Sequence, residues 1–309
     1  MVMDRIVLDL NPNCEYKKPI AACIGYFDGL HLGHLELIKK AKEYAKEMNC
    51  LSALITFDQD PLQILKKEKH MQHIVTFEQR LAIAKKNGID VAIILHFTEE
   101  MASLEPNVFL EKVLGQLNIK ALVCGFDFHY GRFGKGNAIS LQKEVDYPVS
   151  IIDAVSDEIG KISSTRIRES VERGEMESAK RMLGYPFTIM GKVIRGFHQG
   201  TGMGYPTANV EIDEEYILPK LGVYAGYCCI EGKQYPSMIN LGHNPTIKYR
   251  EKPSLEVHIF DFENDLYGRV IDVEFIAFIR EEKKFNRKEE LMQQLDKDNQ
   301  KIRQVLHVE

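Results

Sequence analysis

The sequence predicts an α/β domain built on a parallel sheet, followed by a smaller domain of mostly antiparallel strands that ends in a helix. Two observations support this prediction. From residue 20 to about residue 155, short apolar runs alternate with longer amphipathic segments, whereas beyond residue 184 apolar runs follow one another with glycine and proline between them. Alternating strands and helices are typical of parallel sheets, and consecutive strands are typical of antiparallel ones.

The strands expected in the first domain are the apolar runs at 20–27, 51–57, 91–97, 121–126 and 149–155. A helix is expected after the first run. Its apolar stripe should pack on the sheet, with lysines and glutamates on the opposite face. The stripe consists of Leu35, Ile38, Ala41, Ala45 and Met48.

The strands expected in the second domain are the runs at 187–194, 223–230, 254–262 and 270–279, which predict an antiparallel sheet or a small barrel. A final helix is expected over 286–306, where apolar residues recur at helical spacing. These residues are Leu291, Leu295, Ile302 and Leu306. We place the domain boundary near Gly184, which gives domains 1–184 and 185–309.

Length and charge narrow the class of protein. A chain of 309 residues is long enough for two domains, and 44% hydrophobic with 28% charged residues is ordinary for a soluble globular protein. The net charge of −5 argues against a nucleic-acid partner, which usually requires a concentrated basic face. The N-terminal residues do not resemble a signal peptide, and no apolar run approaches the roughly 18 residues of a membrane span. We therefore expect a cytoplasmic protein with neither nucleic-acid nor membrane partners.

The cysteines fit the same expectation. None of them shows the CxxC spacing of a zinc or redox site, and most lie within apolar runs, where a free thiol behaves as a small hydrophobe. We expect a reducing compartment, with neither zinc nor disulfides. The six residues are Cys14, Cys23, Cys50, Cys124, Cys228 and Cys229.

A strand-to-helix turn in the first domain carries the pattern "IGYFDGLHLGH" (24–34). Backbone amides and the positive end of a helix favour phosphate at the carboxyl edge of a parallel sheet. His31 and His34 could donate hydrogen bonds to triphosphate oxygens and stabilise a leaving pyrophosphate. For an arbitrary HxxH, two turn histidines without such a role are the more frequent interpretation. The case for a metal site is weaker still, because no third histidine, cysteine or carboxylate ligand accompanies the two histidines.

A second anion site is predicted by "KISSTRIRESV" (161–171), where hydroxyl side chains start a helix and arginines follow. Alone, this pattern is more typical of a capped helix with solvated arginines. The chain contains no GxxxxGK[ST] pattern, so a P-loop is excluded.

Together, "GYFDGLHLGH" and "ISSTRIR" resemble the HxGH and ISSTxIR signatures of the nucleotidyltransferases, specifically the FMN adenylyltransferase domain of bacterial bifunctional riboflavin kinase/FAD synthetases. "VCGFDFHYGRFGKG" is similar to that family's GxDFxFG segment. The resemblance implies a Rossmann-like fold in which His31 and His34 contact ATP phosphates. It further implies phosphate contacts from Ser164, Thr165, Arg166 and Arg168, and a nucleotide and flavin pocket formed with Gly25, Phe27, Asp28, Gly33, Phe126, Asp127 and Tyr130.

The implied chemistry agrees with the residues present. The phosphate of FMN is already ionised at neutral pH, so the step needs positioning and charge stabilisation but no general base. Tyr130 stands where the family usually has Phe, and in "FDQDP" Asp60 stands where a histidine is usual. A carboxylate beside phosphates would repel them. Asp60 therefore points away, or helps to hold Mg²⁺, or the flavin is held differently.

In the second domain, "GKVIRGFHQGTGMGYPTANVEI" (191–212) alone is more typical of a hairpin loop that enters a strand. With the later segments "INLGHNPT", "SLEVHIFDF" and "FIREEKKF", it resembles the riboflavin kinase domain of the same family, a six-stranded barrel followed by a helix. Phosphorylating a weakly acidic alcohol calls for a nearby carboxylate, and the resemblance assigns that role to Glu256. It also implies Mg²⁺ and ATP phosphates on Thr207 and Asn209, a glycine loop with Gly204 over the nucleotide, and flavin contacts from Asn244 and Arg280.

The predicted function is therefore FAD biosynthesis: riboflavin is phosphorylated to FMN with ATP and Mg²⁺, and FMN is adenylylated to FAD with release of pyrophosphate. Two alternatives remain open. The second domain could bind flavin without kinase activity, since Thr201 stands where many relatives have a basic residue. Alternatively, the protein could be a non-enzymatic flavin sensor, against which both phosphate motifs argue. The sequence is also compatible with a homo-oligomer.

Overall fold

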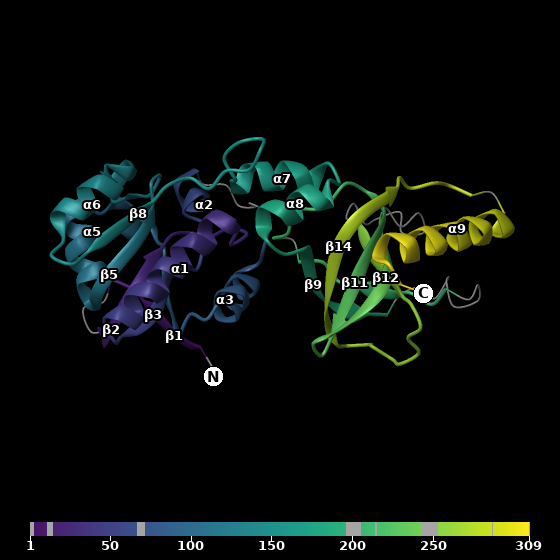
Figure 1. The fold of residues 1–309 in the computed structure, drawn as a ribbon, viewed down its shortest axis with the longest axis horizontal. Coiled ribbons are helices and arrows are strands. Elements are labelled where there is room, and N and C mark those ends of the chain that lie inside the picture. The colour runs from purple at the N-terminus through teal and green to yellow at the C-terminus, as the bar shows by residue number, and fades with distance from the viewer. Residues whose placement is uncertain are drawn as a thin grey trace. The chain divides into compact units, whose positions relative to one another are not determined.

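The computed structural model describes residues 3–10, 15–66, 72–195, 205–213, 215–242, 253–285 and 287–308. The chain forms two compact units, residues 1–163 and 164–309 (Figure 1). The division falls before the position near Gly184 that we expected. Helix α7 (Ser164–Glu172) packs on α8 (Met176–Leu183), and α8 packs on strands of the barrel, so both helices belong to the second unit. Gly184 as the boundary between functional domains stays a prediction.

The first unit is built on a six-stranded parallel sheet with the order β1-β4-β3-β2-β5-β8. The five expected strands are present, which confirms the predicted α/β class. They are β2 (Tyr16–Ile24), β3 (Leu51–Phe57), β4 (Val91–Leu95), β5 (Leu117–Gly125) and β8 (Val149–Ile152). The sixth strand, β1 (Asp4–Leu8), was not expected and lies at the edge beside β4.

Helices cover both faces of this sheet. One core joins sheet residues such as Leu54 to α1 (Leu32–Glu47) and α3 (Phe77–Lys86), while the other joins residues such as Ile55 to α4 (Glu99–Ser103), α5 (Pro106–Lys112) and α6 (Ala138–Glu144). The shorter elements are α2 (Pro61–Lys66), η1 (Leu114–Gln116), η2 (Arg132–Gly134) and the hairpin β6 (His129–Tyr130) with β7 (Gly136–Asn137).

The buried stripe of α1 differs slightly from the expected one. Leu37, Ile38, Ala41 and Ala45 are buried. Leu35 is only partly buried, and Met48, which ends the helix at its C-cap, is exposed. The helix therefore packs by a stripe centred on Ile38 and Ala41, as predicted, but rotated toward Leu37.

The second unit contains a closed antiparallel barrel with the order β10-β13-β12-β11-β14-β9, which confirms the predicted six-stranded barrel. Its strands are β9 (Phe187–Ile194), β10 (Ala208–Val210), β11 (Gly222–Ile230), β12 (Lys233–Gly242), β13 (Ser254–Ile259) and β14 (Val270–Arg280). The C-terminal helix α9 (Lys288–Leu306) packs Ile302 and Leu306 on outer-face residues such as Val223 and Met238.

The described part of the chain contains no helix that is long and apolar enough to cross a membrane. Its cysteines are free thiols, and burial raises the pKa of Cys124 and Cys228 to about 12, so neither is a reactive thiolate at neutral pH. Cys14 lies outside the described residues.

Candidate functional site

The turn between β2 and α1 is strained. Phe27 and Leu30 have positive φ angles of 63° and 37°, which side chains other than glycine rarely adopt. The Phe27 ring folds back over Gly25, where a Cβ would come within 3.2 Å of it. Strain of this kind persists only where the surroundings enforce it, and it is often found at functional sites.

His31 and His34 meet at this turn. His31 is the N-cap residue of α1 but makes no capping hydrogen bond with its side chain. Its ring stacks on that of His34 with 3.7 Å between the centroids, and the Phe27 ring meets His34 edge-on. Gly33 permits this stacking, because a Cβ there would lie 3.2 Å from the His31 Nδ1.

Both imidazoles are neutral at pH 7. Burial lowers the pKa of His31, which is 7% exposed, to about 4. Burial also lowers the pKa of His34 well below its usual value, and the positive charges of Arg80 and Lys161 add to this effect. The Nδ1 atoms of both rings are buried and find no hydrogen-bond partner in the described part of the chain. Unsatisfied buried nitrogens beside a helix N-terminus suit a bound anion.

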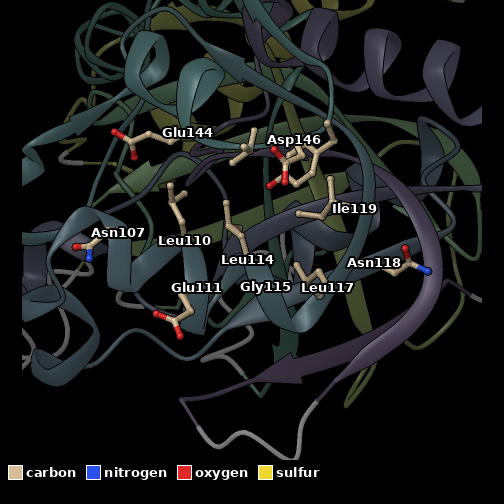
Figure 2. Close-up of a pocket in the computed structure, with 12 residues that line it drawn as sticks. Asn107, Leu110, Glu111, Leu114, Gly115, Leu117, Asn118, Ile119, Glu144 and Asp146 are labelled. Atoms are coloured by element: carbon tan, nitrogen blue, oxygen red, sulfur yellow. The ribbon is translucent and has the colours of Figure 1, made fainter.

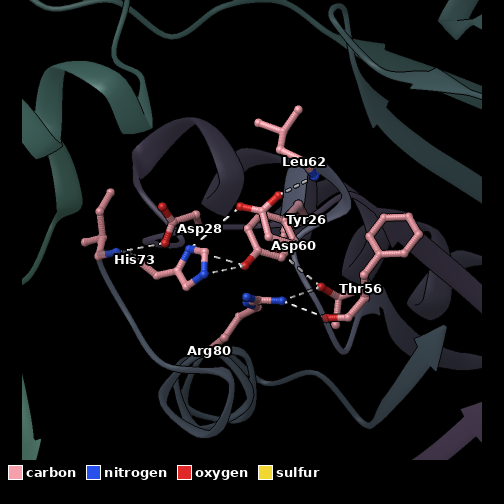
Figure 3. Close-up of polar contacts among 9 residues, drawn as sticks. Tyr26, Asp28, Thr56, Asp60, Leu62, His73 and Arg80 are labelled. Carbon is pink, nitrogen blue, oxygen red and sulfur yellow. Dashed lines mark hydrogen bonds and ion pairs between the residues drawn. The ribbon is translucent and has the colours of Figure 1, made fainter. Parts of the chain in front are cut away.

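Asp28 and Asp60 have structural partners of their own (Figure 3). Asp28 accepts a hydrogen bond from the backbone N–H of Ile74 at 3.0 Å. Asp60 accepts one from the N–H of Leu62 in the first turn of α2, at 2.8 Å, and its other oxygen lies 3.8 Å from the His73 Nδ1. Asp60 is thus directed toward α2 and His73, and its orientation relative to bound phosphates stays a prediction.

Arg80 was missed by sequence reasoning. It lies on the buried side of α3 and is 2% exposed. Its guanidinium donates to the Phe57 carbonyl at 2.9 Å and to the Thr56 hydroxyl at 3.2 Å, and it stacks 4.2 Å from the centroid of the Tyr26 ring. Among the described residues, no carboxylate lies within ion-pair distance of it. The sequence marked Arg80 only by its place between apolar positions of an amphipathic helix.

The end of β5 supplies a further part of the first site. Phe126 is 45% exposed, and the Lys161 ammonium lies 4.3 Å from its ring centroid. Lys161 also donates to Asp127 at 2.8 Å. The charges of Asp127 and Lys161 shift the pKa of His31 in opposite directions, which places them in its neighbourhood. Tyr130 is instead buried on Phe128, and its hydroxyl donates to a Glu144 oxygen.

The hydroxyl and arginine motif forms the predicted helix start. Helix α7 begins at Ser164, and Ile167 anchors it while Thr165 is exposed and the two arginines are partly buried. These residues belong to the second unit and the histidine turn to the first. Their joint action on phosphate stays a prediction.

In the barrel, strand register brings together residues that are far apart in the sequence. Asn209 of β10 lies directly opposite Glu256 of β13, and Asn240 of β12 lies opposite Glu256 on the other side. Directly opposed residues share a face and have Cβ atoms about 5 Å apart. Because Leu255 and Val257 are fully buried, this row faces outward. Burial raises the pKa of the Glu256 carboxyl. Asn240 was not predicted, since only register reveals its position.

The other predicted residues of the second unit divide into two groups. Thr207 is partly buried just before β10. Arg280 donates from Nε to Asp298 of α9 at 2.9 Å and pairs with the same carboxylate through Nη2 at 2.7 Å, so it ties the barrel to this helix. A flavin contact for Arg280 stays a prediction. Gly204 and Asn244 lie outside the described residues, as does Thr201.

A depression of about 570 Å³ lies elsewhere on the first unit, where Leu117 and Ile119 begin β5 (Figure 2). Glu111, Glu144 and Asp146 contribute acidic side chains to its lining. It contains none of the predicted site residues. Open parallel sheets bind ligands at the carboxyl ends of their strands, so this depression lies at the wrong end of β5.

Comparison with known proteins gives two family matches. A riboflavin kinase model matches residues 183–306, and a FAD synthetase model matches residues 14–166. The bifunctional riboflavin kinase/FMN adenylyltransferase of Listeria monocytogenes is 38% identical over 283 residues, covering 91% of this chain and 90% of that protein. The protein of the same name from Bacillus subtilis is 38% identical over 291 residues, covering 93% and 92%.

A solved structure matches both units. It is the crystal structure of a chain from Streptococcus pneumoniae that is named a macrolide-efflux protein. That chain is 32% identical, the TM-score is 0.87, and the match covers 96% of this chain and 99% of that one. The fold described above therefore occurs in an experimentally solved relative along nearly its whole length.

Proposed function

The chain belongs to the family of bifunctional riboflavin kinases/FMN adenylyltransferases, and on this premise we propose that its two units act in succession, the second converting riboflavin to FMN and the first converting FMN to FAD. The order of the two family matches along the chain supports this division. The streptococcal protein is named for macrolide efflux, but both family models and both bacterial relatives are named for flavin enzymes.

The adenylyltransferase proposal rests on the two stacked, neutral histidines. A phosphate oxygen of FMN attacks the α-phosphorus of ATP, the bond to the pyrophosphate oxygen breaks, and negative charge develops on that leaving group. N–H groups of His31 and His34 and the N-terminal amides of α1 stabilise this charge. No proton has to be removed from the attacking phosphate, so the site needs no general base.

The kinase proposal rests on the raised pKa of Glu256 and on its position opposite Asn209. Glu256 accepts the proton of the terminal riboflavin hydroxyl while that oxygen attacks the γ-phosphorus of ATP and ADP leaves. A carboxylate with a raised pKa is the stronger base for this transfer. The oxygen atoms of Thr207 and Asn209 are hard donors of the kind that suits Mg²⁺, which would neutralise phosphate charge. The free thiols fit a reducing compartment, and we place the protein in the cytoplasm.

Two separate assays test the proposal. The parent protein is incubated with riboflavin, ATP and Mg²⁺, and in parallel with FMN, ATP and Mg²⁺, while FMN, FAD and pyrophosphate are measured. The double variant His31→Ala/His34→Ala should lose FAD formation by roughly 100-fold or more, because oxyanion donors are removed, and should keep riboflavin phosphorylation.

Each alternative has its own outcome in these assays. A parent protein that makes FAD but does not phosphorylate riboflavin is a monofunctional adenylyltransferase. A parent protein that binds flavin and makes neither product is a sensor. A double variant that makes FAD at the parental rate contradicts the assignment of the histidines.

A further inference from the structure

The segment that enters strand β10 is held by side chains that are not among the predicted site residues. The Tyr205 hydroxyl donates to the Asp296 carboxylate of α9 at 2.5 Å. The Tyr205 ring meets the ring of His258 edge-on, with 5.0 Å between the centroids. The His258 Nδ1 lies 2.8 Å from the Pro206 carbonyl oxygen. Tyr205 and Pro206 directly precede Thr207, so these contacts fix the backbone next to a proposed metal ligand.

The surroundings of the His258 imidazole and the Tyr205 hydroxyl determine which atom of each carries the hydrogen. A carbonyl oxygen only accepts hydrogen bonds, so the His258 Nδ1 carries the hydrogen. His258 is 9% exposed, and burial lowers its pKa, so one neutral tautomer is selected at pH 7. The Tyr205 hydroxyl is the donor in its hydrogen bond to Asp296, because a carboxylate only accepts.

The anchor on α9 is firm. Asp298, two residues beyond Asp296, is buried and pairs with Arg280 of β14 at 2.7 Å. Farther along the helix, Ile302 and Leu306 pack on the outer face of the barrel. The Asp296 carboxylate therefore sits on a helix that is fixed to the barrel at several points.

Strand β10 needs such support because it is short. It has only three residues, and its pairing with β9 involves Asn209 and Val210. Its pairing with β13 starts at Ala208, so no ladder contact reaches Thr207. His258 lies two residues beyond Glu256, on the same outer face of β13. One strand thus presents both the proposed base and the donor that holds the segment before Thr207.

We propose that Tyr205, His258 and Asp296 are positioning residues of the kinase site, which fix the backbone at Pro206 and thereby set the placement of Thr207 and Asn209 relative to Glu256. This inference rests on the proposed function of the barrel. None of the three residues is assigned contact with substrate. They act through the segment 205–209, and their loss should change Mg²⁺ and ATP usage while leaving the base in place.

Tyr205→Phe tests the proposal, because it removes one oxygen atom and keeps the ring on His258. Misplacement of a reacting group by about 1 Å can lower a rate by about 100-fold, so we expect a 10- to 100-fold loss in kcat/KM for MgATP in riboflavin phosphorylation. FAD formation from supplied FMN should stay unchanged. The matched control is Tyr227→Phe, since the Tyr227 hydroxyl also donates to α9, to the carbonyl of its last residue, Leu306, at 3.4 Å.

A second pair of variants separates positioning from packing. His258→Asn keeps a donor near the place of Nδ1 and should stay within a few-fold of the parent. His258→Leu removes the donor and should lose 10-fold or more. If His258→Leu does not fold, Tyr205→Phe with its control still decides the question.

The proposal is overturned if Tyr205→Phe behaves like Tyr227→Phe, or if His258→Leu matches His258→Asn. Glu256→Gln, measured alongside, separates this failure from failure of the proposed function. If Glu256→Gln abolishes phosphorylation while Tyr205→Phe is normal, only the positioning inference falls. If Glu256→Gln phosphorylates riboflavin normally, the assignment of the kinase site itself is wrong.

Discussion

Lowering the pH from 7.5 to 5 should destabilise the first unit, because buried His31 resists protonation in the folded state. Its pKa falls from 6.5 to about 4 on burial, a difference of about 2.5 (6.5 − 4). The unfolded chain takes up this proton first, so the contribution of His31 to the free energy of unfolding decreases as the pH drops below 6.5 and levels off below about 4. At about 1.4 kcal/mol per pKa unit, the loss approaches about 3 kcal/mol, of which about 2 kcal/mol is reached at pH 5.

His31→Gln supplies the comparison, because glutamine does not titrate. Hydrogen exchange of the β2 amides reports the free energy of unfolding of this unit in both proteins. The free energy of unfolding of the parent, relative to that of His31→Gln, should decrease by about 2 kcal/mol between pH 7.5 and pH 5. The His31 Cε1 proton, followed by NMR, should titrate near pH 4. Titration near 6.5, or a difference in stability that does not change with pH, would refute the reasoning from burial.

Two further predictions concern the second unit and the boundary. Glu256→Gln should lower riboflavin phosphorylation by roughly 100- to 10,000-fold. Because burial raises the Glu256 pKa, the folded parent loses stability as pH rises from the ordinary glutamate pKa through the raised one. The Glu256→Gln variant should therefore have a higher Tm than the parent at pH 7. An unchanged rate of phosphorylation or a lower Tm would contradict the argument. A fragment of residues 1–184 should convert FMN to FAD, whereas a fragment of residues 1–163, which lacks Ser164–Arg168, should not. If the shorter fragment forms FAD, Ser164–Arg168 are not part of the adenylyltransferase site.

Strands were predictable where burial on both faces makes the sequence continuously apolar. Strands β3 and β4 have this pattern throughout, and β2 and β5 have it in their second halves. Strand β1 instead begins with two exposed charged residues, Asp4 and Arg5. In the barrel, β10 is too short to show a pattern, and β12 carries Pro236 among polar residues. For these strands the six-stranded barrel could be expected only through the family resemblance.

The residues of the candidate sites also differ in how far the sequence could predict them. His31 and His34 lie in a local motif that the sequence alone could point to, whereas Glu256 could be assigned only through the family resemblance. The environment of Asp60 could not be predicted in full, because His73 reaches it from another segment. Asn240 likewise becomes visible only through the register of β12 against β13. Long-range contacts leave no short pattern in a single sequence.

The position of β1 at the sheet edge constrains the order in which the first unit can assemble during synthesis. Strands β2 and β3, and then β3 and β4, are neighbours in the sheet and successive in the chain, so they can pair as they emerge. Strand β1 is made first, yet Asp4 pairs with Val91 of β4, and so it has no partner until that later strand is available. During that interval, the charges of Asp4 and Arg5 discourage pairing with strands of other nascent chains. Once β4 is in place, Arg5 forms an ion pair with Glu78 of α3 at 2.8 Å. Arg5 thus has two roles: its charge discourages pairing of the free β1 strand with other chains, and its ion pair later stabilises β1 in the sheet.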